Sequence, residues 1–367
     1  MKINKVLLTG ATGFLGSHIL SDLLQEKATM VYCLVRARDQ DHANKRIAEA
    51  LKTYGFLSLV EQVGKQIIPL IGDLGEEKLG IENDLVLSEL KDLGIIIHSA
   101  ALVKHLGNKG EYEKININAV QQLIDLALET SSHFVHISTT AVAVLGDFTK
   151  NNIFTEDSTI SANVRPANVY LWSKILGEDL VINASKKGLS SSIMRVGHLT
   201  GRYKDGVFQK NESENATYAR LKIILKSGIV PQFMCDYPLE MTPVDACSKA
   251  IMILLRHIER DKNMIYHLNN NYTISYGDFS KMLEQMGYSI SVEKITDYHS
   301  FKDMLSEYSL GKELITGYFL IFRYLKGTDY GDPSNEKTMQ FLKPNGFDWP
   351  KIDTAYIDRV IKSMSTL

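Results

Sequence analysis

Residues 5–16 read Lys-Val-Leu-Leu-Thr-Gly-Ala-Thr-Gly-Phe-Leu-Gly, and this stretch decides the fold. The four residues after Lys5 are apolar or β-branched, which predicts a buried strand that stops at Gly10. Apolar side chains after Gly16 recur at helical spacing. The stretch therefore predicts a strand, a glycine turn and a helix in direct succession.

The three glycines of this turn have the spacing Gly-x-x-Gly-x-x-Gly. A pyrophosphate placed there would meet backbone N–H groups and the positive end of the helix. A tight turn with close strand–helix packing is the alternative explanation, and the strand before and the helix after it favour dinucleotide binding. The loop residues that we expect to contact the cofactor are Gly10, Thr12, Gly13, Phe14, Leu15 and Gly16.

The alternation of strand and helix continues along the first 200 residues. Further strands are predicted at Met30–Val35, Ile67–Ile71, Ile95–His98, Phe134–Ser138 and Ser191–Val196. Helices are predicted at Ala43–Tyr54, Ile117–Thr130 and Val169–Lys187. This pattern predicts an α/β fold, a Rossmann-like doubly wound parallel sheet, with residues 1–200 as its dinucleotide-binding domain and later segments returning to it.

Beyond Gly201 the pattern changes to polar loops and separate helices. The helices are predicted at Ala219–Ser227, Asp245–Arg260 and Tyr276–Gly287 and after Pro350, with an aromatic-rich run at Tyr308–Tyr330. We expect residues 201–367 to form a smaller, mostly helical lobe that binds the substrate.

Composition excludes several classes of function. The 41 basic and 43 acidic residues leave a net charge of −2, so no strong field would attract nucleic acid or an anionic membrane. The three cysteines are too few for a disulfide framework and too scattered for a metal site. The first eight residues lack the apolar stretch of a signal peptide, and the apolar runs at Gly94–Val103 and Gly317–Tyr324 indicate buried core rather than a bilayer span. We therefore expect a cytoplasmic protein without a metal.

The residues after the second predicted strand bear on the choice of cofactor. Proteins that prefer NAD usually place an acid there, whereas this chain has Arg36 and Arg38. Arg46 on the next helix could complete a clamp, because guanidinium groups match phosphate oxygens in pairs. A solvated surface charge is the alternative for Arg36 and, more strongly, for Arg38. The pattern favours NADPH.

Two further segments follow predicted strands and could meet the nucleotide. Asp73 and Leu74 come after the third strand, where the aspartate could accept from the adenine amino group or serve an ordinary turn. Ala100 and Ala101 end the fourth strand with Ser99, where bulk would block the cofactor, although close packing explains small residues equally well.

Tyr170 and Lys174 form the pattern Tyr-x-x-x-Lys, which on a helix places both side chains on one face. A lysine beside a tyrosine, with a cationic nicotinamide nearby, would stabilise the phenolate and move the pKa of the tyrosine toward neutral. Thr139 and Thr140 end the fifth strand, at the sheet edge where ligands of doubly wound folds bind. We expect Thr139 to be catalytic, and capping of loop amides to be the role of whichever threonine is not.

Asn116 precedes the helix that leads to the fifth strand. It could orient a water or backbone group near Lys174, and helix capping is the alternative.

Together these motifs resemble the extended short-chain dehydrogenase/reductases. More narrowly, the chain is similar to the thioester reductase domains that end nonribosomal peptide synthetases and carboxylic acid reductases, over nearly its whole length. The segments that carry the resemblance are Leu34–Ala37 with Arg46, Gly72–Leu74, His98–Val103, His136–Thr139, Tyr170–Lys174, Met194–Gly197 and Pro243–Asp245.

The resemblance implies that Thr139, Tyr170 and Lys174 are the catalytic triad, with Arg36 and Arg46 on NADPH. It implies reductive release of an acyl or peptidyl thioester, held on the phosphopantetheine arm of a carrier protein, as an aldehyde or further as an alcohol. We expect a monomer or a domain of a larger synthase. The alternatives are a nucleotide-sugar epimerase or dehydratase, and a non-catalytic NADP-sensing regulator on the same fold.

Overall fold

The computed structural model describes most of the chain. The described residues are 4–25, 30–81, 88–103, 108–145, 153–160, 169–212, 215–257, 263–305 and 332–364. The aromatic-rich run Tyr308–Tyr330, and with it Gly317–Tyr324, lies outside them.

A seven-stranded sheet in which all neighbouring strands are parallel forms the centre of the larger lobe. Its strands, in spatial order, are β3 (Ile67–Ile71), β2 (Met30–Val35), β1 (Lys5–Thr9), β4 (Ile95–His98), β5 (His133–Thr139), β7 (Ser191–Val196) and β12 (Met264–Leu268). The strand order reverses direction at β1, which is the arrangement predicted for a doubly wound fold. The predicted α/β fold is confirmed.

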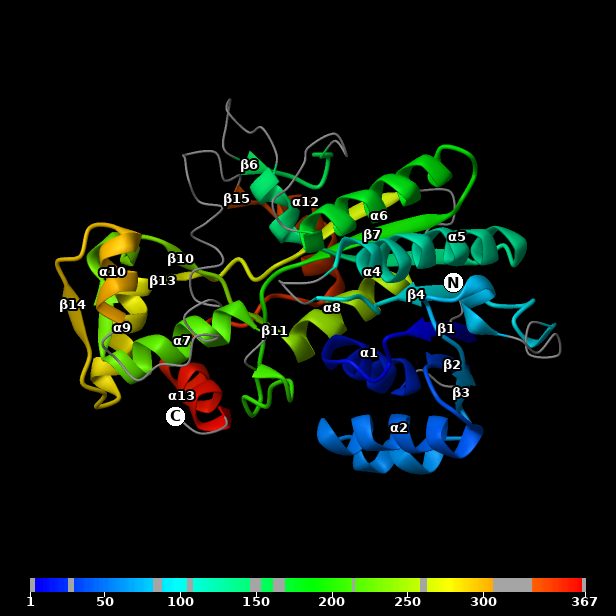
Figure 1. Cartoon of the computed structure of the whole chain (residues 1–367), viewed down its shortest axis with the longest axis horizontal. Helices are drawn as coiled ribbons and strands as arrows, with labels where there is room; N and C mark the ends of the chain where they lie inside the picture. Colours follow the sequence, from blue (N-terminus) through cyan, green and yellow to red (C-terminus); the bar gives the residue numbers. More distant parts are fainter. Residues whose placement is uncertain are drawn as a thin grey trace.

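Helices cover both faces of this sheet, because apolar strands without polar alternation must be buried on both sides. On one side lie α1 (Phe14–Gln25), α2 (Gln40–Thr53) and α8 (Val244–Arg256), and on the other α5 (Ala119–Glu129) and α6 (Val169–Ser185) (Figure 1). Helix α1 packs against α8, and α5 packs against α6. The segment before α5 is helical from α4 (Lys109–Tyr112) through the π-helical turn η3 (Glu113–Asn118), so the helix begins earlier than predicted.

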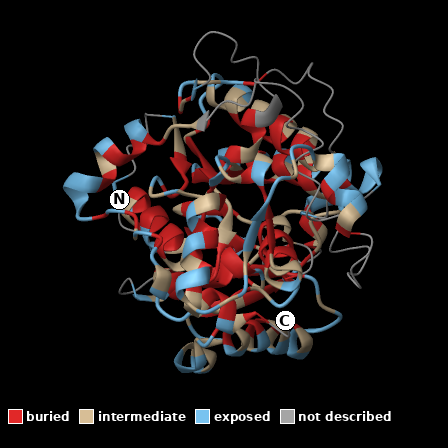
Figure 2. Cartoon of the chain, turned by 90° about the vertical axis from the view of Figure 1, so that its left-hand side faces the viewer, coloured by how far each residue is buried: buried red, intermediate tan, exposed pale blue. Residues whose placement is uncertain are grey.

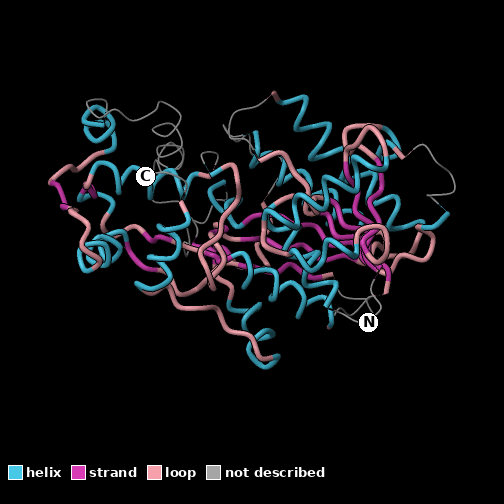
Figure 3. Tube along the Cα trace, turned by 90° about the horizontal axis from the view of Figure 1, so that it is seen from below, coloured by secondary structure: helices cyan, strands magenta, loops and turns pink. Residues whose placement is uncertain are grey.

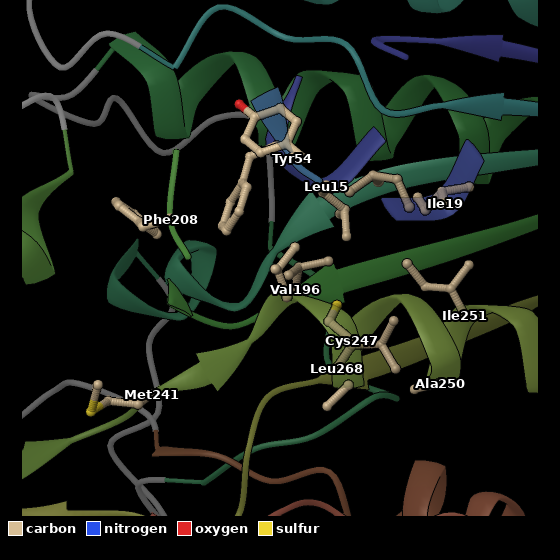
Figure 4. Close-up of a cluster of buried hydrophobic side chains, with 14 of the residues drawn as sticks. Leu15, Ile19, Tyr54, Val196, Phe208, Met241, Cys247, Ala250, Ile251 and Leu268 are labelled. Atoms are coloured by element: carbon tan, nitrogen blue, oxygen red, sulfur yellow. The ribbon is translucent and has the colours of Figure 1, made fainter. Parts of the chain in front are cut away.

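The core lies in two layers that flank the sheet. Buried residues gather at the centre of the molecule and exposed ones along its outer helices (Figure 2). In the layer around α1, Leu15 and Ile19 pack with Val196 of the sheet and with Cys247 and Ile251 of α8 (Figure 4). Close packing at this point fixes where α1, and therefore the glycine loop before it, stands over the sheet edge.

The second lobe is built from helices and very short strands (Figure 1). The helices are α7 (Ala216–Ser227), α9 (Tyr276–Gln285), α10 (Tyr298–Leu305) and α13 (Thr354–Ser363). Helix α12 (Glu336–Leu342) packs instead against β12 and α8 of the larger lobe. The strand pairs of the remaining structure are β6 (Ile153–Phe154) with β15 (Asp332–Pro333), β8 (Leu199–Thr200) with β11 (Thr242–Pro243), β9 (Ile229–Pro231) with β14 (Ser291–Glu293) and β10 (Pro238–Leu239) with β13 (Ile274–Ser275). Short 3-10 turns lie at η1 (Leu57–Gln62), η2 (Glu77–Gly80), η4 (Thr140–Leu145), η6 (Gln232–Met234) and η7 (Lys343–Asn345). Seen from below, the strands of the large sheet run together, and the short strands β9 and β14 lie at the opposite end (Figure 3).

The chain after residue 201 does not stay in the second lobe. Strand β12 pairs with β7 and extends the large sheet, and α8 covers that sheet. Near the chain end, the hydroxyl of Tyr356 bonds to the side chain of Thr200 and to the carbonyl of Gly201, each at 2.7 Å. These connections tie the two lobes together at the edge where β7 ends.

Three further sequence predictions concern the cysteines, membrane-spanning helices and the apolar run Gly94–Val103. Cys33, Cys235 and Cys247 are all free thiols, and the described residues hold no cluster of three or more histidine, cysteine or acidic residues that could bind a metal. No helix within the described ranges has the length and apolar character needed to cross a bilayer. In the run Gly94–Val103, β4 is buried as predicted, but Val103 is 48% exposed and lies at the mouth of a cleft.

Candidate functional site

The glycine loop folds so closely on itself that side chains would not fit. Gly10 has a φ of +79°, and its carbonyl accepts from the amide of Gly13 at 2.8 Å. A Cβ on Gly16 would lie 2.0 Å from the Gly10 carbonyl oxygen, and one on Gly10 would lie 2.7 Å from the nitrogen of Ala100. The backbone of the loop, rather than any side chain, therefore forms this wall of the site.

A cleft of about 500 Å³ begins at this loop and follows the carboxyl edge of the sheet. It contains nearly all the residues that the sequence singled out. The predicted residues that line it are Gly10, Thr12, Gly13, Phe14, Leu15, Gly16, Arg36, Arg46, Asp73, Leu74, Ser99, Ala100, Ala101, Thr139, Tyr170 and Lys174.

Two arginines meet at one end of the cleft. Arg36 follows β2 and is exposed, while Arg46 on α2 donates a hydrogen bond from its guanidinium to the backbone carbonyl of Arg36. Arg38 points elsewhere, since it is exposed and pairs with Asp39 at 3.1 Å. Arg36 and Arg46 therefore line the cleft, whereas Arg38 is a surface charge, which is the alternative that weighs more for Arg38 than for Arg36.

Asp73 and Ala100, which we expect to contact the nucleotide, also have roles in a turn and in packing. Asp73 accepts from the amide of Gly75 at 2.9 Å, as a turn aspartate does, and its half-buried side chain also faces the cleft. The close approach of Gly10 to Ala100 accounts for the small size of Ala100. In both places the packing explanation and the ligand explanation are compatible, because the same atoms serve the turn and line the cleft.

Thr139 and Tyr170 lie together at the other end of the cleft. Their hydroxyls share a hydrogen bond, although the residues are far apart in sequence, on β5 and on the first turn of α6. Burial raises the pKa of Tyr170 to about 12, with a smaller contribution from Tyr112 and an opposing one from Thr139. The expectation of a pKa moved toward neutral includes a cationic nicotinamide nearby and stays a prediction. In the protein's own contribution, dehydration outweighs the hydrogen bond. Tyr170 is therefore a protonated hydroxyl over the whole physiological range.

Lys174 lies one turn after Tyr170 and is buried. Its ammonium donates to the backbone carbonyl of Ile137 at 2.8 Å. Burial lowers the pKa of Lys174 to about 8, against the opposing attraction of Glu178. A lysine so placed changes its charge near physiological pH.

The neighbouring threonine and Asn116 have structural partners. Thr139 accepts from the amide of Ala141 at 3.2 Å, so the capping role falls on Thr139 itself, while Thr140 is buried and bonds to the carbonyl of Val196. Asn116 bonds through its amide to both backbone groups of Leu102, at 2.7 and 3.0 Å, and to the Ser173 hydroxyl. Asn116 thus sits one layer behind the cleft wall, where it orients backbone rather than capping a helix.

Sequence reasoning missed several residues of the cleft. Tyr54, Gln209 and Asn211 line it from the end of α2 and from the segment after Gly201. Phe208 in that segment packs edge-on against Phe14 of the glycine loop, with ring centroids 5.0 Å apart. No local pattern marks these side chains, because only the folded chain brings the second lobe against α1.

The cleft suits a dinucleotide. The backbone of the glycine loop lines one wall, where a Cβ on Gly10 or Gly16 would clash with neighbouring backbone atoms. The end with Arg36 and Arg46 is cationic, and the other end holds Thr139 and Tyr170. Its volume of about 500 Å³ lies within the range of small-molecule and cofactor sites.

Comparison with known proteins agrees with this geometry. The sequence pattern of an NAD-binding family described as "Male sterility protein" matches residues 8–251. A linear gramicidin synthase polypeptide of Brevibacillus parabrevis is 31% identical over 291 residues, which cover 79% of this chain. The chain spans 6% of that protein and 22% of the L-2-aminoadipate reductase large subunit of Candida glabrata, which is 26% identical.

Solved structures show the same relationship. A thiolation-reductase di-domain from an archaeal nonribosomal peptide synthetase superposes with a TM-score of 0.83 at 30% identity, covering 99% of this chain and 75% of that one. The terminal R domain of the myxalamid PKS-NRPS pathway gives a TM-score of 0.84 at 27% identity, covering 99% and 90%. A UDP-glucuronic acid 4-epimerase from Bacillus cereus gives 0.61 at 18% identity, which shows likeness of fold alone.

Proposed function

The chain belongs to the NAD-binding family described as male sterility protein, and from that premise we propose that it is an NADPH-dependent thioester reductase. It is an oxidoreductase of the extended short-chain dehydrogenase/reductase type that uses NAD(P). The proposed reaction is the reductive release of an acyl or peptidyl thioester as an aldehyde, with a second reduction to the alcohol as an optional continuation.

One observation carries the proposal. The hydrogen-bonded Thr139 and Tyr170 stand at the end of the same cleft that begins at the Gly10–Gly16 loop. A dinucleotide bound at that loop would place its nicotinamide in the same cleft as a carbonyl that accepts hydrogen bonds from those hydroxyls. Such convergence favours hydride chemistry on a carbonyl over a binding function.

The preference for NADPH over NADH rests on Arg36 and Arg46. Two guanidinium groups beside the end of β2 offer paired donors and positive charge to a 2′-phosphate. An acid that would bind an unsubstituted ribose is absent from Val35–Ala37. The loop residues, Asp73, Leu74, Ala100 and Ala101 would hold the remainder of the nucleotide, with Asn116 supporting the wall through Leu102.

The protein groups divide the work at the reacting carbonyl. Bound NADPH supplies the hydride. Thr139 and Tyr170 donate hydrogen bonds to the carbonyl oxygen as negative charge builds there, and Tyr170 transfers its proton to give a thiohemiacetal. Lys174 holds the nicotinamide ribose and, when charged, assists the loss of that proton. Collapse of the thiohemiacetal breaks the carbon–sulfur bond, returns the hydroxyl proton to Tyr170 and releases an aldehyde and a thiolate. The thiolate then takes a proton from water to become the free thiol.

The partner proposed for this site is a carrier protein whose phosphopantetheine arm bears the thioester. The similarity to a thiolation-reductase di-domain and to a gramicidin synthase polypeptide supports this partner. We propose that residues 1–200, with β12 returning to them, form the NADP-binding domain. Residues 201–367 would then form the lobe that receives the arm.

The experiment is NADPH turnover on a panel of acyl-pantetheine thioesters, carrier-bound thioesters and simple aldehydes, with products identified by mass spectrometry. Aldehyde and free thiol formed in step with NADPH oxidation are expected. Binding of NADPH without turnover on any substrate would instead support the regulator. Tightly held NAD without NADPH consumption would support the epimerase.

A further inference from the structure

A buried ion pair lies directly behind the proposed catalytic residues. Glu178 follows Lys174 by one turn of α6, as Lys174 follows Tyr170, so the three share one face of the helix. The Glu178 carboxylate accepts hydrogen bonds from Nε and Nη2 of Arg195 on β7, at 3.1 and 2.7 Å. The Arg195 side chain is 0% exposed and that of Glu178 is 6% exposed.

The same carboxylate also accepts from the strand that carries Thr139. The Ser138 hydroxyl donates to Glu178 at 2.5 Å, and Ser138 immediately precedes Thr139 on β5. Glu178 therefore connects the helix of Tyr170 and Lys174 to the strand end of Thr139. A buried ion pair is weak evidence for stability in general, but this one joins the two elements that form the site.

The opposite side of Arg195 is fully occupied, which fixes its orientation. Its Nη1 donates to the Ser158 carbonyl at 3.0 Å and to Nε2 of His267 at 3.2 Å, and the guanidinium stacks over the Phe154 ring at 4.6 Å. Burial, followed by the charge of Arg195, lowers the pKa of His267 to about 3. Neutral His267 donates from Nδ1 to the Ser334 carbonyl at 2.7 Å and so presents a lone pair to Arg195.

The other titratable groups around Lys174 do not compensate its charge. His98 on β4 and His136 on β5 are buried, and burial lowers the pKa of His98 to about 3 and that of His136 well below its usual range. Both are neutral at the pH where Lys174 titrates. Tyr170 is protonated there as well. Among the described residues, Glu178 is the carboxylate that attracts the Lys174 ammonium, and Arg195 is the cation beside it.

We propose that Glu178 is a positioning residue that, held by Arg195, keeps Lys174 charged and aligned with Thr139 during the reaction. The proposal rests on the proposed function for its catalytic meaning, while its electrostatic content can be tested without any substrate. Removing the carboxylate would leave two cations, Lys174 and Arg195, without the anion that attracts both. Lys174 would then lose its proton at a lower pH.

The test compares Glu178→Gln with Glu156→Gln. Glutamine keeps the size of glutamate and removes its charge. Glu156 is a matched control because it is also buried, and its carboxylate accepts from the amide and the hydroxyl of Thr338, at 2.8 and 2.7 Å, rather than from α6 or β7. The readout is the pH dependence of Lys174 acetylation by acetic anhydride, followed on its peptide by mass spectrometry.

The labelling midpoint of Lys174 is expected near pH 8 in the unmodified protein and about one pH unit lower in Glu178→Gln. The Glu156→Gln midpoint should not move. The same shift should appear in the kcat–pH profile, with kcat falling about twofold at pH 7 from the change in protonation alone. A purely structural role would instead lower kcat equally at every pH.

An unchanged midpoint in folded Glu178→Gln would overturn the proposal. Should that variant not fold, Glu178→Asp takes its place, because aspartate keeps the charge and should keep the midpoint close to pH 8. A midpoint a full unit lower in Glu178→Asp would equally overturn it. Because labelling needs no thioester, a labelling shift without reductase activity would reject the proposed function and leave the role of Glu178 standing.

Discussion

The ammonium of Lys174 lies 2.8 Å from the backbone carbonyl of Ile137, two residues before Thr139. This bond joins the helix that carries Tyr170 to the strand that carries Thr139, at the level where both reach the cleft. The side chain that we propose for the nicotinamide ribose therefore also sets the spacing of the two hydroxyls. Mutation of Lys174 should for this reason disturb the alignment of Thr139 and Tyr170 as well as the ribose contact.

Replacement of Tyr170 by phenylalanine should abolish most of the reductase activity. The ring would still fill its place, but the oxygen of the thiohemiacetal would lose its proton donor, a loss that typically costs about 10²–10⁴-fold in rate. Single-turnover oxidation of NADPH with an acyl-pantetheine thioester measures the effect. Tyr272→Phe is the matched control, since the Tyr272 hydroxyl bonds to exposed Asp348, away from the cleft. Undiminished turnover in Tyr170→Phe would reject Tyr170 as the donor.

Replacement of Arg46 by alanine should weaken the binding of NADPH and leave the binding of NADH almost unchanged. The substitution removes one guanidinium beside the proposed 2′-phosphate and also releases the carbonyl of Arg36. A charge-assisted hydrogen bond of this kind contributes about 1.5–3 kcal/mol, so the Kd for NADPH should rise about 10- to 150-fold. Isothermal titration with both cofactors measures it.

Arg38→Ala is the control for that experiment, because Arg38 is exposed and paired with Asp39. Its cofactor affinities should match those of the unmodified protein. Equal losses for NADPH and NADH in Arg46→Ala would contradict a specific phosphate contact.

The sequence predicted the fold and most of the cleft because those features repeat locally. Apolar strands, a glycine turn and a Tyr-x-x-x-Lys helix each leave a pattern within some ten residues, and parallel topology then brings their ends to one edge. The roles of Glu178 and Gln209 left no such pattern, since each depends on a partner from a distant segment. The burial that raises the pKa of Tyr170 left no pattern for a related reason, because burial cannot be read from the spacing of two residues.

Replacement of Gly16 by alanine should eliminate cofactor binding. The added Cβ would lie 2.0 Å from the Gly10 carbonyl oxygen, so the loop must open and its amides must leave their present arrangement. NADPH affinity should fall below detection in fluorescence titration, because the backbone donors act only together. Gly110→Ala is the control, as its Cβ would meet Asn108 at an ordinary 3.4 Å. Retained affinity in folded Gly16→Ala would show that this loop does not hold the cofactor.

Replacement of Lys174 by methionine should stabilise the protein at pH 7 while it impairs activity. Burial is the main cause that lowers the pKa of Lys174 from 10.5 to about 8. Between these values the unfolded chain binds more protons than the folded one, so the free energy of unfolding rises with pH through this window. Below about pH 8 the folded protein carries the full cost of a buried ammonium. Methionine removes that cost and also loses the hydrogen bond to Ile137, for a net gain of about 2 kcal/mol.

Urea unfolding at pH 7 should show this gain, and at pH 10 most of it should be gone because Lys174 is then neutral in the folded protein. The exposed Lys187→Met should change stability by less than about 0.5 kcal/mol at either pH. A Lys174→Met variant that is less stable by the same amount at both pH values would mean that the amine is not held in a dehydrated, charged state.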